Sequence, residues 1–315
     1  MKHHCAHLCF LTLLEMTTQT VERPVNKKLW LAAIKPPMYS VAVMPIWVGS
    51  AVTYALTGTF DTVVFFTFLL SAILILAWEN LSNDVFDSET GVDVNKANSL
   101  VNLTGKKSLI FWIANGCLVL GLLGIAAIAY WQQDLTVIGL ILLCCAIGYV
   151  YQGPPFRLSY KGLGEFLCFF AFGPVAFAAV SYSQTKSWSV TSFAASIVIG
   201  IATSLILFCS HFNQVKDDDA LGKKTPVVRL GTHRAAQLLP WICGSVYGLT
   251  VMFVLLNLFP VWTLLVFVSA PYAHKLCHCV WTQHHQPETL LSCRFIAVAF
   301  HFWTGLMLGL GFVVG

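Results

Sequence analysis

Long apolar segments alternate with short polar loops along most of this sequence. Each apolar segment has about 20 residues, the length of helix needed to cross about 30 Å of hydrocarbon. A lipid-facing backbone must satisfy its hydrogen bonds internally, and no barrel-like alternation is present, so each segment is predicted to be a helix. The pattern predicts nine spans, near residues 37–57, 62–83, 108–131, 135–152, 163–183, 190–210, 236–258, 260–281 and 295–314. The predicted fold class is therefore all-α, a polytopic membrane bundle of about nine transmembrane helices.

The composition supports a membrane domain and excludes an ordinary soluble fold. Hydrophobic residues make up 57% of the 315 residues and charged residues only 10%, whereas soluble domains have roughly 25% charged residues. We predict one membrane domain over residues 35–315, embedded in a lipid bilayer, with no separate soluble domain. The net charge of +4 does not indicate nucleic-acid binding, because the basic residues lie in short loops between apolar spans.

The N-terminal segment, residues 1–34, is predicted to be a cytoplasmic tail. Its apolar run at 8–14 is far too short to span a membrane, and no small-residue cleavage site follows, which disfavours a signal peptide. Met16 begins a polar stretch that would make an ordinary start for a membrane protein. Residues 1–15 are therefore interpreted as an upstream extension without a function of their own.

The distribution of Lys and Arg predicts the orientation of the chain. With nine spans, 17 of the 18 basic residues fall on one side, and only Lys186 falls on the other. Basic residues are enriched in the cytoplasmic loops of membrane proteins. The N-terminus is therefore predicted in the cytoplasm and the C-terminus outside.

The 11 cysteines do not indicate a disulfide framework, because most lie within apolar spans, where free thiols behave as small hydrophobes. One cluster, Cys277, His278 and Cys279 with His284 and His285, contains residue types that bind zinc. Its spacing matches no usual structural zinc motif. We therefore interpret this cluster as part of an ordinary loop.

Acidic residues number only 14, and more than half of them cluster in two patches on the same predicted face of the membrane. The first patch, residues 79–93, follows the second predicted span. If the helix continues, Asn80, Asp84 and Asp87 are spaced at i, i+4 and i+7, with Asn83 four residues before Asp87, so their oxygens share one face. Mg²⁺ prefers oxygen ligands, usually one or two carboxylates together with substrate phosphates. The patch therefore predicts half of a magnesium-diphosphate site.

The second patch, residues 211–225, follows the sixth predicted span. Gln214 and Asp218 are spaced at i and i+4, and Asp217 lies beside Asp218. Lys223 and Arg229 follow, so carboxylates suited to a metal ion lie near cations suited to a phosphate. The second patch thus predicts the other half of the same site.

Other interpretations of the two patches remain open at this level. A single charged run is usually a solvated loop, but two patches in equivalent positions, each with carboxamides at helical spacing, favour a shared site. A transporter with acidic coupling sites is the alternative outside the enzymes. It would place charged groups near the middle of the membrane, on broken helices, whereas both patches lie at the ends of spans.

The motif Asn83-Asp84-x-x-Asp87-x-x-x-Gly91-x-Asp93 resembles the first aspartate-rich motif of the UbiA superfamily of intramembrane aromatic prenyltransferases. Its Gly91-x-Asp93 ending resembles the branch that acts on 1,4-dihydroxy-2-naphthoate. The segments 153–165 and 222–231 are similar to two further motifs of that branch. The resemblance extends from about position 35 to the C-terminus, and it implies a multi-pass protein of a bacterial inner membrane or a thylakoid membrane.

This resemblance implies transfer of a phytyl or other polyprenyl group from its diphosphate to 1,4-dihydroxy-2-naphthoate. The reaction would depend on Mg²⁺, release CO₂ and diphosphate, and belong to phylloquinone or menaquinone biosynthesis. The implied catalytic residues are Asp84, Asp87 and Asp218. The implied metal ligands are Asn83, Asp84, Asp87, Asp93, Gln214, Asp217 and Asp218. The implied diphosphate contacts are Lys223 and Arg229, and the implied acceptor contacts are Arg157, Lys161, Tyr149 and Tyr151.

Position 214 departs from the usual pattern of the family, which has an aspartate there. The phytyl-transferring members of oxygenic phototrophs are the nearest in this respect. The amide oxygen of Gln214 can still bind Mg²⁺, but it brings no charge, so Asp217 is predicted to compensate. Homogentisate and a chlorophyllide are alternative aromatic acceptors, which the Gly91-x-Asp93 ending disfavours.

Overall fold

The computed structural model describes residues 35–90 and 99–315. These residues form helices and loops, and no strand occurs among them, so the all-α prediction is confirmed. The predicted N-terminal tail, residues 1–34, lies outside the described residues, and so does Asp93.

A helical segment lies at each of the nine predicted spans. The segments are η1 (Pro36–Tyr39) with α3 (Ser40–Thr57), α4 (Thr62–Thr90), α6 (Lys107–Gln132), α7 (Thr136–Gln152), α8 (Gly164–Phe170) with η3 (Ala171–Val175) and α9 (Ala176–Thr185), α10 (Val190–Ala220), α12 (Thr232–Leu255), η4 (Val261–Ser269) with α13 (Ala270–Gln283), and η5 (Pro287–Ser292) with α14 (Cys293–Val314). The short helices α5 (Leu100–Thr104), η2 (Leu158–Lys161) and α11 (Pro226–Leu230) lie in the connecting loops.

Most of these segments have the length and composition of membrane spans. In the described part of the chain, 7 helices are long and apolar enough to cross a membrane. The helix α7 is apolar but has only 17 residues, the lower limit for a span. The eighth predicted span is divided between η4, a 3-10 helix that rises about 2.0 Å per residue, and α13, which rises about 1.5 Å per residue. The structure thus confirms a polytopic helical membrane protein.

The helices α4 and α10 extend beyond their predicted ends at positions 83 and 210. They have 29 and 31 residues, which correspond to about 44 and 47 Å of helix, compared with about 30 Å of hydrocarbon. Each helix therefore continues out of the apolar layer and carries its acidic patch on a helical surface. This geometry fixes which polar side chains of each patch share a face.

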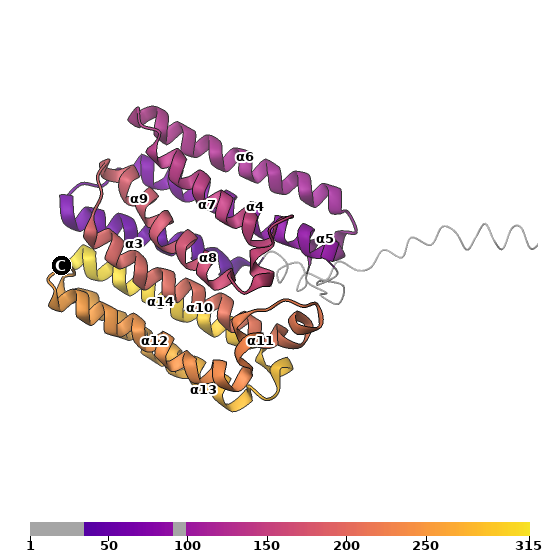
Figure 1. Cartoon of the computed structure of the whole chain (residues 1–315). Coiled ribbons are helices and arrows are strands. Elements are labelled where there is room, and N and C mark those ends of the chain that lie inside the picture. The colour runs from indigo at the N-terminus through magenta and orange to yellow at the C-terminus, as the bar shows by residue number, and fades with distance from the viewer. Residues whose placement is uncertain (1–34, 91–98) are drawn as a thin grey trace, which may run out of the picture.

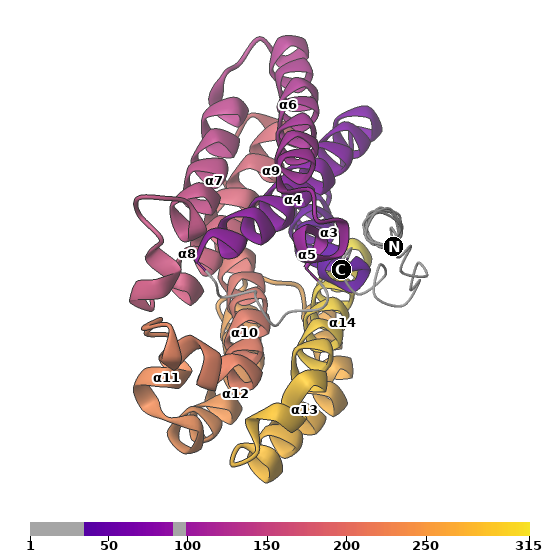
Figure 2. The same cartoon turned by 90° about the vertical axis from the view of Figure 1, so that its right-hand side faces the viewer.

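The helix α10 is the central element of the bundle. In an apolar stretch of 18 residues of α10, 72% is buried inside the protein. The corresponding share for the peripheral helix α6 is 22%. The helix α10 contacts α3, α8, α12 and α14, and Figure 2 shows it between the group formed by α4, α6, α7 and α9 and the group formed by α11, α12 and α13. Because α10 touches both groups, polar residues at its end can face those of α4 across the bundle.

A π-helical turn, η3, interrupts the fifth span beside α10. It contains Pro174, and the backbone of Gly173 departs from helical geometry. A Cβ atom at Gly173 would lie only 2.8 Å from the carbonyl oxygen of Ser196 on α10, so a larger residue would push the two helices apart. Proline and π-turns are common causes of a local bend in a helix, and here the bend shapes the wall of the cavity described below.

The two acidic patches and the C-terminus lie at opposite ends of the bundle. Figure 1 shows α5 and α11, the short helices next to the patches, at one end and the C-terminus at the other. The chain must therefore cross the bundle an odd number of times between the first patch and the C-terminus. The nine predicted spans place seven crossings there, which is in agreement.

We expect an epitope tag after Gly315 and a tag inserted between Thr185 and Trp188 to be accessible from the same side of the membrane. A tag inserted after Gly222 should be accessible only from the other side. Protease protection or antibody binding in oriented vesicles would measure this. If the Gly315 tag were protected together with the Gly222 tag, the count of nine crossings would be wrong.

Candidate active site

Residues of both patches line a single cavity of about 220 Å³ at one end of the bundle, although Asp218 is not itself among the lining residues. From α4, the lining residues are Glu79, Asn80, Asn83, Asp84 and Asp87. From α10 and the loop after it, they include His211, Gln214 and Lys223. Residues more than 100 positions apart in the sequence thus share one site, as the shared-site interpretation of the patches requires.

The acidic face of α4 has the spacing expected of a continuous helix. Asn80, Asp84 and Asp87 all face the cavity, because residues separated by three or four positions lie on the same side of a helix. The amide nitrogen of Asn80 donates to the carbonyl oxygen of Leu76, 3.1 Å away, which leaves its amide oxygen as a potential ligand. Carboxylate and carboxamide oxygens therefore line one wall of the cavity.

Asp84 is the most buried of these acids, with 2% of its surface exposed. Its carboxylate accepts a hydrogen bond from the Lys35 ammonium at 3.2 Å and another from the backbone amide of Leu100 at 3.0 Å. Burial of a carboxylate is costly unless it is paired and hydrogen-bonded. These two contacts offset part of the cost of burying the Asp84 side chain near the end of α4.

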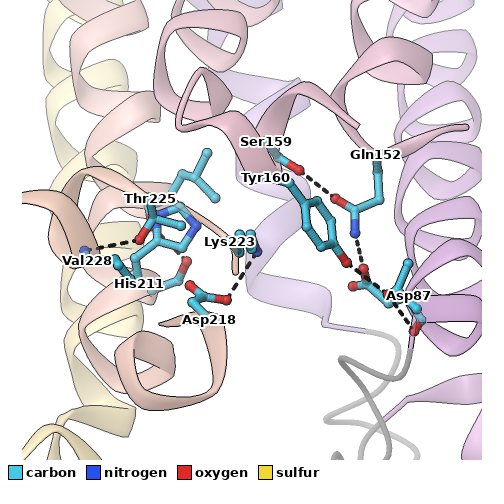
Figure 3. A network of polar contacts seen from close by, with 12 residues as sticks. Asp87, Gln152, Ser159, Tyr160, His211, Asp218, Lys223, Thr225 and Val228 are labelled. Atoms are coloured by element: carbon cyan, nitrogen blue, oxygen red, sulfur yellow. Dashed lines mark hydrogen bonds and ion pairs between the residues drawn. The ribbon is translucent and has the colours of Figure 1, made fainter. Parts of the chain in front are cut away.

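Asp87 is held from the opposite side by the loop that follows α7. The side-chain amide of Gln152 donates to its carboxylate, and the hydroxyl of Ser159 donates to the amide oxygen of Gln152 at 2.8 Å. Figure 3 shows this chain of contacts from Ser159 through Gln152 to Asp87. Because both Gln152 and Ser159 are buried, the chain fixes the orientation of the Asp87 carboxylate.

Tyr160 connects the end of α4 with the second patch. Its hydroxyl is 2.8 Å from that of Thr90, and the Lys223 ammonium lies over its ring, 5.6 Å from the centroid. Burial is the main cause of the raised pKa of the Tyr160 phenol. The phenol therefore stays protonated at neutral pH and can donate a hydrogen bond.

Asp218 is the buried acid of the second patch, with 1% of its surface exposed. One carboxylate oxygen lies 3.4 Å from the Lys223 ammonium, as Figure 3 shows. The other oxygen is buried without a hydrogen-bond partner. An unsatisfied buried carboxylate oxygen calls for a ligand such as a metal ion or a water molecule.

The loops after α7 and α10 are joined by backbone contacts. The amide of Lys224 donates to the carbonyl oxygen of Tyr160 at 2.8 Å. The Arg229 guanidinium donates to the carbonyl oxygens of Lys161 at 2.6 Å and Lys224 at 3.0 Å. Gly162, with φ +78°, passes so close that a Cβ atom would lie 2.3 Å from the Lys224 carbonyl oxygen. These contacts form a clamp, which we define as residues 160–162 together with Lys224 and Arg229.

The remaining predicted site residues lie at the margin of the cavity or away from it. Tyr151 lines the cavity. Tyr149 is 40% exposed and its hydroxyl donates to the carbonyl oxygen of Pro154. Arg157 lies 3.8 Å from Glu89, and the side chain of Lys161 is exposed.

Asp217 is exposed, whereas the neighbouring Asp218 is buried. Successive residues in a helix are turned by about 100°, so Asp217 would reach the cavity only if the end of α10 unwound. The arrangement therefore gives no support to the idea that Asp217 compensates for Gln214. Gln214 itself lines the cavity.

Several cavity residues were not predicted as site residues from the sequence. Lys35 and Arg294 line the cavity, but their charges were interpreted as topology signals only. Gln152 carried no signal, because a single Gln at the end of an apolar span is uninformative. His211 and Glu79 lie within the two patches, and their spacing to Gln214 and Asn83, at three and four residues, would have placed them on the same faces.

A second, apolar cavity of about 70 Å³ adjoins the first. The two share Leu76, Glu79, Ala171 and Phe172 as lining residues. The apolar cavity is otherwise lined mostly by aliphatic and aromatic side chains of α3, α4 and α7. A polar cavity at the end of the bundle thus lies directly beside an apolar one further along the helices.

The residues of the polar cavity fit a magnesium ion that is held together with a diphosphate. No group of three or more His, Cys, Asp or Glu side chains able to hold a metal alone occurs among the described residues. Mg²⁺, however, usually binds one or two carboxylates and takes its other ligands from substrate phosphates and water. The carboxylate and amide oxygens on α4 line the cavity and supply such ligands. Asp218, whose second oxygen is unpartnered, lies next to the cavity through its ion pair with the lining residue Lys223.

Comparisons with known proteins agree with this geometry. The sequence profile of the UbiA prenyltransferase family matches residues 42–303. The 2-carboxy-1,4-naphthoquinone phytyltransferase of Synechocystis sp. is 53% identical over 289 residues, which cover 92% of this chain and 94% of that protein. The chloroplastic protein of the same name from Arabidopsis thaliana is 40% identical over 304 residues, which cover 94% of this chain and 79% of that protein.

A solved structure shows the same fold at low sequence identity. A UbiA homolog from Archaeoglobus fulgidus bound to GPP and Mg²⁺ has a TM-score of 0.57 and 17% identity, and the match covers 91% of this chain and 100% of that chain. The helical arrangement is thus retained where most side chains differ.

We expect Gly162→Ala to destabilise the clamp, because a methyl group would meet the Lys224 carbonyl oxygen and the residue has a positive φ. The expected loss is about 1–3 kcal/mol, seen as a lower Tm of the purified protein in detergent. Gly139→Ala is the matched control, since a Cβ there meets nothing within 4 Å. Equal Tm values for the two variants would show that the close approach at Gly162 is unimportant.

Proposed function

This chain belongs to the UbiA prenyltransferase family, and on that premise we propose that it transfers a phytyl or other polyprenyl group from its diphosphate to 1,4-dihydroxy-2-naphthoate. The transfer releases diphosphate and CO₂, and its product is an intermediate of phylloquinone or menaquinone. The observation that carries this proposal is that residues of both acidic patches line one polar cavity, which shares lining residues with a neighbouring apolar cavity. The relatives from Synechocystis and Arabidopsis, both named as phytyltransferases of a carboxylated naphthoquinone, support the donor and the acceptor.

The polar cavity is suited to the diphosphate of the donor. Asp84, Asp87 and Asp218, with Asn83 and Gln214, would hold Mg²⁺, which offsets the charge of the diphosphate and makes it a better leaving group. Asp93 belongs to the same set by motif. Lys35 and Lys223, which pair with Asp84 and Asp218, can turn toward phosphate oxygens once metal binding satisfies the two carboxylates.

The apolar cavity is suited to the first part of the isoprenoid chain. Leu76 and Phe172 line both cavities and therefore flank the boundary at which the donor changes from charged to apolar. When the bond between the allylic carbon and the diphosphate oxygen breaks, the positive charge develops at this boundary. Aromatic faces stabilise nearby cations, and Phe172 and Tyr151 are the aromatic residues of the cavity wall.

The acceptor completes the reaction by attacking the allylic cation with the ring carbon that carries its carboxylate. A new carbon–carbon bond forms, and the bond to the carboxylate breaks with loss of CO₂. Arg294 lines the cavity and can pair with the carboxylate before that loss. Arg157 and Lys161, the contacts implied by the motif, lie in the loop over the cavity, where their charges favour entry of an anionic ring.

We infer that the end of the bundle with the cavity faces the cytoplasm, with the N-terminus there and the C-terminus outside. The split of 17 basic residues to 1 supports this orientation. The acceptor is a soluble anion and would enter from the aqueous side, while the donor and the product partition into the bilayer of an inner or thylakoid membrane.

The alternatives considered from the sequence are less well supported. Homogentisate and a chlorophyllide are different acceptors for the same chemistry, but neither appears in the names of the two relatives above 30% identity. A transporter would need charged groups near the middle of the membrane, whereas the carboxylates of Asp84, Asp87 and Asp218 lie on the helical ends that project from the apolar layer.

We expect activity to require Mg²⁺, and Asp84→Ala, Asp87→Ala and Asp218→Ala each to lower kcat by at least about 100-fold, because each removes charge from the diphosphate site. Asp219→Ala is the matched control, since Asp219 is exposed and, within the described residues, its ion pair is with Lys224. Product formation by the purified protein, measured by mass spectrometry, checks this. Full activity in excess chelator would exclude the metal site.

We expect product from 1,4-dihydroxy-2-naphthoate with phytyl diphosphate and little or none from homogentisate or a chlorophyllide. Incubating the protein with Mg²⁺, each acceptor and a series of prenyl diphosphates would measure the preference. Product from homogentisate alone would refute the acceptor assignment and leave the prenyltransferase assignment intact.

A further inference from the structure

A partly buried pair of ionisable side chains, one of which lines the polar cavity, has no role in the chemistry described so far. The Nδ1 atom of His211, on α10, is 2.8 Å from Oε1 of Glu165, on α8. His211 is only 2% exposed, and its side chain is among the cavity-lining residues. The pair thus joins two helices and borders the site at the same time.

The geometry of the pair determines which ring nitrogen faces the cavity. Glu165 engages Nδ1, and a carboxylate in this position fixes the tautomer with the proton on Nδ1. The Nε2 atom then carries the lone pair. His211 has no other hydrogen bond to the described residues and is not among the residues whose buried polar atoms lack partners, so its Nε2 is accessible from the cavity.

Other features indicate that the pair is more than a helix-helix contact. The second carboxylate oxygen of Glu165 is buried without a partner, which a purely structural site would be expected to avoid. Gln214, one turn along α10 from His211, also lines the cavity. The imidazole therefore lies on the same face of α10 as the diphosphate site.

The proposed reaction needs a group that handles one proton. The ring of the acceptor becomes a better nucleophile when the hydroxyl next to its carboxylated carbon loses its proton. In the proposed function Asp84, Asp87 and Asp218 are committed to the metal and the diphosphate, and Glu79 lies at the junction with the apolar cavity. A neutral imidazole held by a carboxylate is the usual general base for this task.

We propose that His211 is the catalytic base that takes the proton from the acceptor hydroxyl, and that Glu165 is the residue that positions it. The proposal rests on the proposed function and specifies the part of the site that binds the acceptor. The acceptor ring is then bound between His211 and the allylic end of the donor.

The step balances in protons and electrons. As His211 Nε2 accepts the hydroxyl proton, the C–O bond becomes a carbonyl and the ring electrons form the new bond from the carboxylated carbon to the allylic carbon. The intermediate is a β-keto carboxylate, which readily loses CO₂. The electron pair of the broken C–C bond restores the aromatic ring and leaves an oxyanion, which takes the proton back from His211.

The main test is His211→Gln in the purified full-length protein, assayed with Mg²⁺, the prenyl diphosphate and 1,4-dihydroxy-2-naphthoate. General-base catalysis contributes about 10²–10⁴-fold, so kcat should fall by that factor while the Kd of the prenyl diphosphate stays within about twofold. Added imidazole should restore part of the activity of His211→Gly, which a structural role would not allow. Glu165→Gln should lower kcat less than His211→Gln, and His233→Gln, at an exposed position on α12, should have no effect.

Two results would overturn the proposal. They are an unchanged kcat in His211→Gln and a failure of imidazole to rescue a His211→Gly protein that still binds the prenyl diphosphate. If the wild type instead makes no product from 1,4-dihydroxy-2-naphthoate at any pH, the proposed function fails before the role of His211 is reached. The two failures are therefore distinguishable.

Discussion

The cost of placing charge in hydrocarbon is the constraint on which this structure depends. A carboxylate in the apolar layer must be paired, hydrogen-bonded or exposed to water. The protein meets this requirement by extending α4 and α10 past the apolar layer, so that Asp84, Asp87 and Asp218 lie at the boundary. There the two buried acids, Asp84 and Asp218, each form an ion pair with a lysine. Charge that is costly inside the membrane thereby becomes concentrated at one end of the bundle.

Concentration of charge also explains why the site is covered by loops that are tied to one another. A diphosphate in water is strongly hydrated, and a loose site would lose much of its electrostatic effect to solvent. The clamp holds the loop after α7 against the loop after α10 through main-chain carbonyls. From the same loop, Ser159 donates to Gln152 and Gln152 donates to Asp87, so the loop also holds the Asp87 carboxylate in place. The polar network thus links the two halves of the site without passing through the apolar core.

Below the polar layer the fold solves a different problem, which is to admit an apolar chain without leaving a large empty space. The bundle does this with a small second cavity next to the π-turn η3, where Gly173 lies against α10. Glu79 lies at the junction of the two cavities. The change from polar to apolar lining occurs within about one turn of α4, which matches the change from diphosphate to hydrocarbon in a prenyl donor.

The sequence by itself determined the class of fold, the nine helical segments and the identity of the acidic residues, because hydropathy and helical spacing are local properties of the chain. It also indicated that Asn80, Asp84 and Asp87 share a face. Only the tertiary structure showed that Lys35, Gln152, His211 and Arg294 line the same cavity, and that Asp217 is exposed. The physical reason is that a side chain's partners depend on which helices pack together, and α10 brings residues from five other spans to one cavity.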